Sequence, residues 1–247
     1  MIIISPAKRQ NVPEKNRSQG QPVGLAQAKD LLADISALDR ETLTKILAVS
    51  QDIGQKSWED FQTLQQKGMQ ASEAVAAIDL YQGDVFKFLD VSSLNDHDLL
   101  FMQEHLRIVS AFYGWLKPLD GIWPYRLEMT SRLPGYRGLA GFWQEAISLE
   151  LSKNKPDFIF NLASQAYAQA VVKPEGSIWV DVVFQDKDRH GKFKVVAVKA
   201  KRMRGKILRY MLTNRIEHPE GLLAYQEDGY VFNEHLSSPN QLVYQAQ

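Results

Sequence analysis

The sequence predicts an α/β fold (mixed α+β), with one compact domain in which helices surround a central mixed sheet. Three observations support this class. Short apolar segments of strand character lie at 2–4, 157–161 and 242–244, so both ends and the middle of the chain contribute strands. Segments with apolar residues at helical spacing alternate with them. No repeat, low-complexity tract or linker divides the 247 residues, so we expect a single domain over 1–247.

Helices are expected to dominate the first half. In order, we expect a strand at 2–4, a surface loop at 9–24, helices at 25–38, 39–53, 59–67 and 72–78, and a long helix from 95 to 113. The loop is rich in Gln, Asn, Pro and Gly, which favour irregular chain. Asp39 is expected to cap the second helix and Asn95 or Asp96 the last, which Gly114 ends.

Strands and helices alternate in the second half. We expect helices at 139–151 and 202–216, a strand at 157–161, and short strands at 222–225, 230–232 and 242–244. Residues 177–184 and 192–199 alternate apolar and polar side chains around Asp188-Arg189-His190-Gly191, which is typical of a β-hairpin.

The composition excludes several classes of protein. The chain has no cysteine, which rules out disulfides, thiolate zinc sites, iron–sulfur clusters and thiol-based peroxidases. The absence of cysteine also fits a reducing compartment. The N-terminus has no basic leader, and no apolar stretch reaches the ~20 residues of a membrane span. We therefore expect a cytosolic protein with no membrane partner.

The net charge of zero conceals a strong asymmetry along the chain. Residues 28–104 contain 14 acids and 6 bases, whereas residues 187–215, which include Arg189, contain 11 bases and one acid. Such a concentration of like charge is typical of a surface that binds a polyanion. The alternative is a solvated helix face whose charges are neutralised by acids from elsewhere in the fold.

Most of these bases lie where a strand is expected to give way to the helix at 202–216. They are Lys199, Lys201, Arg202, Arg204, Lys206 and Arg209. Cations are unfavourable at a helix N-terminus unless an anion compensates for them. Along the helix, Arg202, Lys206 and Arg209 are spaced i, i+4 and i+7 and form one stripe, which suits contact with a phosphate backbone.

Residues 106–129 mix aromatic side chains with charged ones. The segment contains Lys117, Asp120, Arg126 and Glu128 as well as Tyr113, Trp115, Trp123 and Tyr125. It weakly resembles a helix-hairpin-helix, in which backbone N–H groups and an arginine contact a DNA phosphate. The alternative is that the aromatic residues are core, which we prefer, and that Arg126 forms an ion pair with Glu128 or Asp120.

Other motifs point less strongly to chemistry. Ser5-Pro6-Ala7-Lys8 ends the first strand and suits a phosphate-contacting turn. A nucleophilic Ser5 activated by Lys8 would need a helix that Pro6 disfavours. The five histidines show no metal-ligand spacing, and no Walker A or dinucleotide fingerprint is present, so we expect neither a metal nor a cofactor.

Several motifs occur in order along nearly the whole chain. They include Ser5-Pro6-Ala7-Lys8, Tyr81-Gln82-Gly83-Asp84-Val85, Leu116-Lys117-Pro118-Leu119-Asp120, Pro124-Tyr125-Arg126-Leu127-Glu128-Met129, Asn161-Leu162-Ala163-Ser164 and Gly229-Tyr230-Val231-Phe232. With them the chain resembles the YaaA peroxide-stress protein family. The resemblance implies one compact α/β domain with a positively charged cleft, a helix-hairpin-helix-like element and DNA binding. It links the protein to protection against hydrogen peroxide through limitation of free iron and of oxidative DNA damage, without implying a reaction.

The sequence departs from the family pattern at three positions. Ala166 stands where the family tends to place an acid before Tyr167, and Arg9 stands where Thr is usual. An active site that used the acid would be in doubt in this chain. Met203 replaces the more usual Ala and leaves the charge of the basic junction unchanged.

The leading hypothesis is a peroxide-stress protein that binds DNA phosphates, independently of sequence, between two walls. One wall comprises Lys199, Lys201, Arg202, Arg204, Lys206 and Arg209, and the other Lys8, Lys117 and Arg126, with Asn214 and Arg215 behind. A second hypothesis is an enzyme acting on a nucleotide or nucleic acid where Ser5, Lys8, Tyr113, Asp120, Tyr125, Arg126 and Glu128 converge. A third is an iron-binding protein, for which spacing identifies no ligands.

Overall fold

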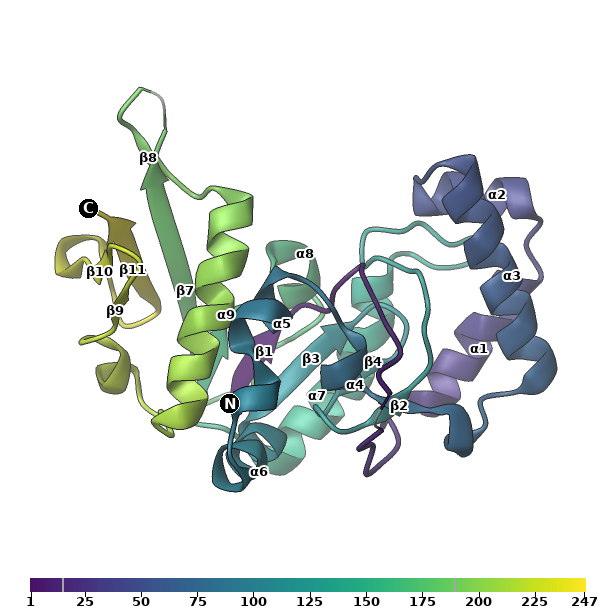
Figure 1. Ribbon diagram of the computed structural model, residues 1–247, viewed down its shortest axis with the longest axis horizontal. Coiled ribbons are helices and arrows are strands. Elements are labelled where there is room, and N and C mark those ends of the chain that lie inside the picture. Colours follow the sequence, from purple (N-terminus) through teal and green to yellow (C-terminus); the bar gives the residue numbers. More distant parts are fainter. Residues whose placement is uncertain (15, 189) are drawn as a thin grey trace.

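A large mixed sheet organises the computed structural model, which describes residues 1–14, 16–188 and 190–247 (Figure 1). The strands are β1 (Ile2–Ile4), β3 (Leu106–Ser110), β4 (Gly114–Leu116), β6 (Phe158–Asn161), β7 (Ile178–Lys187), β8 (Phe193–Lys194), β9 (Gln226–Glu227), β10 (Tyr230–Phe232) and β11 (Gln241–Ala246). Their order is β4-β3-β1-β6-β7-β11-β10-β9, and β8 pairs with β7. A separate pair joins β2 (Val75–Ala76) to β5 (Gly121–Ile122).

The centre of the sheet is parallel. Strands β3, β1, β6, β7 and β11 run in one direction, and β4, β10 and β9 are antiparallel additions at the edges. In β1, Ile3 is opposite Arg107 of β3 on one side and Asn161 of β6 on the other. Because carboxyl ends of parallel strands meet at one edge, the residues that follow β1, β3 and β6 come together there.

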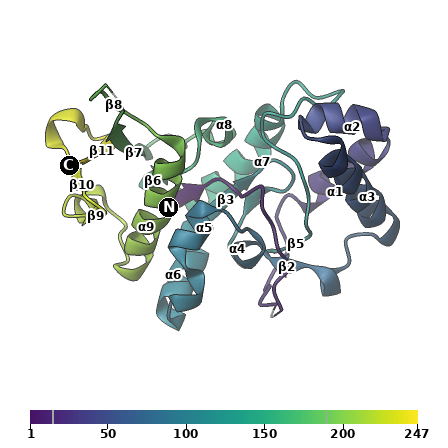
Figure 2. The ribbon, with the colours of Figure 1, turned by 45° about the horizontal axis from the view of Figure 1, so that its top comes forward.

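The helices cover the sheet and extend the fold to one side. They are α1 (Leu25–Ser36), α2 (Arg40–Leu47), α3 (Gln51–Lys67), α4 (Ala77–Leu80), α5 (Asp84–Leu89), α6 (Asp96–His105), α7 (Leu139–Asn154), α8 (Gln165–Ala168) and α9 (Ala197–Thr213). Short 3-10 turns occur at Ala71–Glu73, Val91–Ser93, Pro219–Leu222 and Glu234–Leu236. Helices α5 and α9 lie side by side in both ribbon views, and α1, α2 and α3 gather at the opposite end from the C-terminal strands (Figures 1 and 2).

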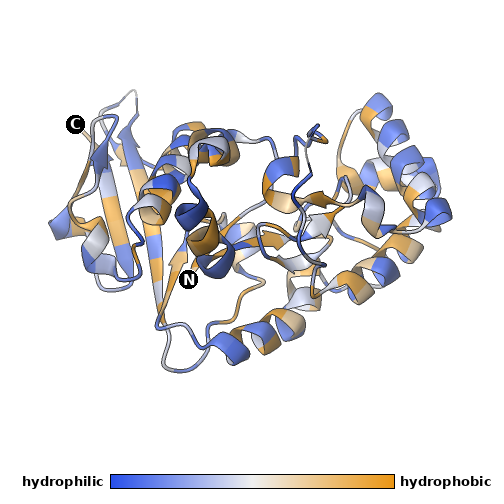
Figure 3. Ribbon diagram, turned by 60° about the horizontal axis from the view of Figure 1, so that its bottom comes forward, coloured by the Kyte–Doolittle hydropathy of each residue, from blue (hydrophilic) through white to orange (hydrophobic). Residues whose placement is uncertain are grey.

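One hydrophobic core joins the two ends. Strand β7 alternates buried and partly exposed residues, and its buried side chains Val180, Val182 and Phe184 belong to the same cluster as the inner face of α9. At the other end, Phe61 of α3 packs against Phe112, with ring centroids 5.8 Å apart. Figure 3 shows apolar and polar residues alternating on the elements at both ends. The chain is therefore a single compact α/β domain, as expected.

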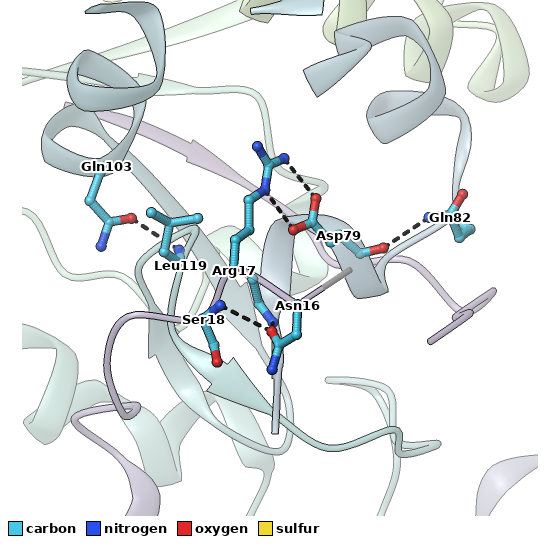
Figure 4. Close-up of polar contacts among 8 residues, drawn as sticks. Asn16, Arg17, Ser18, Asp79, Gln82, Gln103 and Leu119 are labelled. Carbon is cyan, nitrogen blue, oxygen red and sulfur yellow. Dashed lines mark hydrogen bonds and ion pairs between the residues drawn. The ribbon is translucent and has the colours of Figure 1, made fainter. Parts of the chain in front are cut away.

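The N-terminal loop over residues 9–24, as far as it is described, is irregular as expected and is held by side chains. Arg17 donates two hydrogen bonds of 2.7 Å to Asp79, and the Asn16 amide donates to the carbonyl of Ala74 at 2.6 Å. Figure 4 shows the Arg17–Asp79 pair beside the bond from Leu119 N–H to Gln103. These contacts fix the loop across the surface, so the residues at its start hold a defined position.

The expected helix from 95 to 113 is wrong in its second half. Asn95 caps the helix as predicted, accepting from Asp98 N–H at 3.0 Å, but α6 ends at His105 and β3 follows at once. All five residues of β3 are buried. A short run that is buried on both faces, including Arg107 and Ser110, lacks the alternation of a half-exposed strand, so periodicity alone could not separate strand from helix.

The expected helix-hairpin-helix-like element at 106–129 is also wrong. The described chain there is the β3–β4 hairpin, β5 and irregular chain, with no helix. Ser110 closes the hairpin turn, because its hydroxyl accepts from the N–H groups of Phe112 and Tyr113 at 3.1 and 3.0 Å. The turn ends at Gly114, whose φ is +69°.

The ends of several other helices and strands also differ from those expected from the sequence. The helix expected at 39–53 breaks at Ala48, which adopts φ +50°, so Ile53 belongs to α3. Residues 72–78 form a 3-10 turn, β2 and the start of α4, and 222–225 form a turn with no strand. The hairpin of β7 and β8 is confirmed, but α9 starts at Ala197 and absorbs the end of the expected second strand. Arg189 of its turn lies outside the described residues.

Substitution of Gly114 should destabilise the protein strongly. A Cβ there would lie 2.3 Å from the Trp143 ring, in addition to the strain of a positive φ. We expect Gly114→Ala to lower the free energy of unfolding by about 3 kcal/mol, measured by urea denaturation. Gly135→Ala is the control, since Gly135 has φ +82° but no atom within 4 Å of the added Cβ. It should cost about 1 kcal/mol. Equal losses would show that the close approach to Trp143 does not matter.

Candidate functional site

A cleft of about 490 Å³ opens at the carboxyl edge of the parallel strands. Five basic residues line it, Lys8, Arg9, Arg126, Lys201 and Arg204, against two acids, Asp84 and Glu128. Ser5, Ser164 and Tyr167 also contribute to its surface. We call this space the cationic cleft. Its position agrees with the general rule that open α/β sheets bind ligands beyond the carboxyl ends of their strands.

The base of the cleft joins the ends of β1 and β6. The Ser5 hydroxyl accepts from Ser164 N–H at 2.9 Å and lies 3.4 Å from the Ser164 hydroxyl. At the end of β6, Asn161 donates to Asp181 at 2.7 Å and accepts from Ala163 N–H at 2.9 Å. These bonds hold the two turns together and place two serine hydroxyls at the surface of the cleft.

Arg204 is the most unusual cation of the cleft. It projects from α9, its Nε is buried, and no hydrogen bond or ion pair joins its guanidinium to the described residues. Burial lowers the pKa of Arg204, and the charge of Asp181 opposes that shift. A partly desolvated cation whose Nε lacks an acceptor is costly, so Arg204 is the foremost candidate in the cleft for contact with a bound anion.

The other cations of the cleft differ in their partners. Lys8 forms an ion pair of 2.5 Å with Glu128. Arg126 and Lys201 have no ion pair within the described chain. Lys201 and Arg204 are three residues apart and therefore share one face of α9. Arg126 comes from the segment after β5, so the cleft gathers cations that are distant in sequence.

Buried hydroxyl groups position the segment that bears Arg126. The Tyr125 hydroxyl lies 2.9 Å from that of Tyr81 and 2.8 Å from that of Ser110. Burial raises the pKa of Tyr125 to about 12, so its hydroxyl stays neutral. The Tyr125 N–H also donates to the side-chain carbonyl of Gln10 at 2.9 Å. This network confirms that the aromatic residues of 106–129 are core and shows how they fix Arg126.

The expected basic stripe on α9 is not left free, because acids pair with Arg202 and Lys206, and carbonyl and hydroxyl oxygens accept hydrogen bonds from Arg209. Lys199 pairs with Asp186 at 2.6 Å, Arg202 with Asp228 at 2.5 Å, Lys206 with Glu227 at 2.7 Å and with Asp228 at 2.8 Å, and Arg215 with Asp98 at 3.5 Å. Arg209 donates to the carbonyls of Leu89 and Asp90 and to Ser93. The Asn214 amide donates to the Tyr210 carbonyl at 2.9 Å. None of these residues lines the cleft, and neither does Lys117.

The expected convergence of enzyme residues holds only in part. Ser5, Lys8, Tyr125, Arg126 and Glu128 line the cleft, whereas Tyr113 and Asp120 do not. The Tyr113 hydroxyl donates to Trp123 C=O at 2.9 Å and accepts from Trp123 N–H at 3.0 Å, which makes it a structural group. Asp120 accepts from Lys117 N–H at 2.8 Å. The ion pair expected of Arg126 with Glu128 or Asp120 is absent from the described contacts, since Glu128 pairs with Lys8.

Sequence reasoning missed several polar residues of the cleft, among them Tyr167 and Asp84. Tyr167 follows the 161–164 turn, and burial raises its pKa. Asp84 begins α5 within the Tyr81-Gln82-Gly83-Asp84-Val85 motif. Its place in one of the motifs that carry the family resemblance was therefore a signal that could have identified it as a site residue. Of the positions that depart from the family pattern, Arg9 lines the cleft. Ala166 is in α8, one residue before Tyr167.

Two further properties of the described chain bear on function. In residues 1–14, 16–188 and 190–247, no three or more His, Asp or Glu side chains are grouped so that they could hold a metal ion. Within the same ranges, no helix has the length and apolar character that crossing a bilayer requires.

The fold and the cleft define an α/β protein with a cationic, partly desolvated cleft at the carboxyl edge of its sheet. Residues 1–236 match the family model described as Peroxide stress protein YaaA, and the chain belongs to that family. It is 36% identical to a UPF0246 protein of Rickettsia rickettsii (strain Iowa) over 253 residues, 99% of this chain and 98% of that protein. UPF0246 proteins of Clostridium beijerinckii and Acaryochloris marina are each 34% identical, over 99% of this chain and 96% and 98% of their own lengths.

The structural role of Asp120 can be tested by pH. Burial raises its pKa from the ordinary 3.8 to about 6, opposed by the Lys117 N–H bond and the charges of Lys117 and Arg107. Between pH 4 and 6 the folded protein therefore keeps a proton that the unfolded chain has released, and folding loses stability as the pH rises. Asp120→Asn keeps an acceptor for Lys117 N–H and removes the titration.

The measurement is urea denaturation of both proteins from pH 4 to pH 7. The free energy of unfolding of the parent, minus that of Asp120→Asn, should fall by up to about 1.4 kcal/mol per pH unit towards pH 6 and then level off. Parallel pH dependences of the two proteins would contradict this assignment.

Proposed function

We propose that this member of the peroxide-stress family protects the cell by binding DNA, with phosphate groups entering the cationic cleft. The observation that supports it most is the Arg204 guanidinium, which is partly buried in the cleft with no acceptor among the described residues. A DNA phosphate supplies the missing charge and several acceptor oxygens. Arg126 and Lys201 lie on the same cleft and add to the attraction.

The proposed wall is narrower than the one expected from the sequence, because the cations of the α9 stripe lie outside the cleft and are already paired. It comprises Arg9, Arg126, Lys201 and Arg204, together with Lys8, which lines the cleft while paired with Glu128. Serine hydroxyls at positions 5 and 164 are further donors for phosphate oxygens. Since all of these groups recognise the backbone, binding should depend steeply on salt and little on base sequence.

This proposal links the cleft to the family description. DNA occupied by the protein is shielded from the oxidants that free iron generates from peroxide, which would limit damage in the cytosol without any reaction on the protein. An enzyme acting on a nucleotide would use the same cleft, but without Tyr113 and Asp120. For direct iron binding, the described residues offer no grouped ligands to name.

Fluorescence anisotropy with a labelled DNA duplex tests the proposed wall. We expect Arg204→Gln to weaken binding about tenfold at low salt and to reduce the slope of log K against log[salt] by about one. Arg202→Gln is the matched control, because Arg202 lies on the same helix outside the cleft and pairs with Asp228, which Lys206 also neutralises. It should change binding less than twofold. Equal losses in the two variants, or none in Arg204→Gln, would refute the assignment.

A further inference from the structure

A second space, of about 770 Å³, adjoins the cationic cleft. It lies between α3, the N-terminal loop and the segment that leads to Arg126. Lys8, Gln10, Tyr125 and Arg126 line both spaces. The bond from Tyr125 N–H to Gln10 holds the two segments of this shared border together. We call the second space the adjoining hollow; the two spaces lie on either side of this shared border.

The adjoining hollow differs from the cleft in polarity. Three apolar side chains on its surface are exposed, namely Val12 (56%), Ile53 (42%) and Pro124. Apart from the shared Lys8 and Arg126, its charged residues are Lys56, Lys67, Asp52, Asp60 and Glu73. With the two shared bases included, the hollow has four bases and three acids, whereas the cleft has five bases and two acids, so the excess of positive charge is smaller in the hollow. A phosphate is favoured in the cleft, and an uncharged, partly apolar group is favoured in the hollow.

Each space has one buried donor without an acceptor. The buried side-chain polar atoms that lack a partner in the described chain are Arg204 Nε and Trp123 Nε1. Arg204 lines the cleft, and Trp123 lines the hollow with 3% of its surface exposed. A buried indole N–H usually has an acceptor. Trp123 Nε1 is covered in the free protein, so a ligand acceptor reaches it only when neighbouring side chains shift.

We propose that the two spaces together bind one unpaired nucleotide, with its phosphate in the cationic cleft and its base in the adjoining hollow. The phosphate half rests on the proposed function, and the base half is new. A base is a flat ring with apolar faces and acceptor atoms on its edge, which matches the exposed Ile53, Val12 and Pro124 and the donor of Trp123. A free nucleotide or an unpaired position in a strand supplies this chemistry, whereas a paired base is stacked and its edge is engaged.

Fluorescence anisotropy with probes of equal length tests phosphate binding in the cleft and base binding in the hollow separately. The probes are a single strand with bases, the same backbone without bases, and a duplex. We expect the strand with bases to bind about tenfold more tightly than the abasic strand, because burial of the base adds apolar contact. Ile53→Trp fills the hollow from the exposed surface of α3 and should abolish this advantage, with binding of the abasic strand unchanged. Leu149→Trp is the control, since Leu149 is 59% exposed on α7 and lines neither space.

Trp123→Phe provides a second variant that keeps an aromatic ring in the core and removes the indole donor together with part of the ring volume. It should weaken the strand with bases severalfold and leave the abasic strand unaffected. Equal binding of both strands, or an advantage that survives Ile53→Trp, would overturn the base half and leave the proposed function standing. If Arg204→Gln weakened the binding of none of the three probes, the proposed function itself would be overturned. A nucleoside monophosphate that displaces the strand at micromolar concentration identifies the free nucleotide as the ligand, and failure to displace it identifies the strand.

Discussion

Parallel pairing of β1 with β3 and β6 is the constraint on which the rest of the structure depends. All three isoleucines of β1 are at most 1% exposed, because strands flank it on both edges and its two faces are covered. A slip of one residue would exchange the faces of every side chain in the strand. The register therefore fixes where the chain emerges, which places Ser5 beside Ser164 and brings Lys8 to Glu128. The cationic cleft is a consequence of this geometry.

Helix α9 separates its cations by face. Its buried face contains Met203, Ile207 and Met211, and one flank is neutralised by acids of the C-terminal segment. Only Lys201 and Arg204 are directed to the cleft. Pairing the flank removes repulsion that a cluster of cations would otherwise impose on folding. Arg204 retains a desolvation cost that the charge of Asp181 offsets only in part. Sites that break the rules of stability in this way are typically functional.

The sequence predicted the fold class, the cap at Asp39, the hairpin at β7 and most helices, because each depends on local periodicity or on one side chain. It failed at Leu106–Ser110, where burial on every side removes the periodic signal. It also misjudged the α9 stripe, since the partners of Arg202 and Lys206 lie more than 20 residues later and only tertiary structure brings them near. Yet the i, i+3 spacing of Lys201 and Arg204 was present in the sequence and distinguishes them from the i, i+4, i+7 stripe.

The dimensions of the two spaces also limit what they can hold. Volumes of about 490 and 770 Å³ are in the range of sites that enclose small molecules, and a double helix contacts a protein over a far larger surface. A duplex would place one backbone across the mouth of the cleft, whereas the unpaired nucleotide that we propose would place its phosphate in the cleft and its base in the adjoining hollow. The excess of positive charge is larger in the cleft than in the adjoining hollow, which agrees with a phosphate in the cleft and an uncharged base in the hollow. Shape and charge thus favour the same ligand, from observations that are independent of each other.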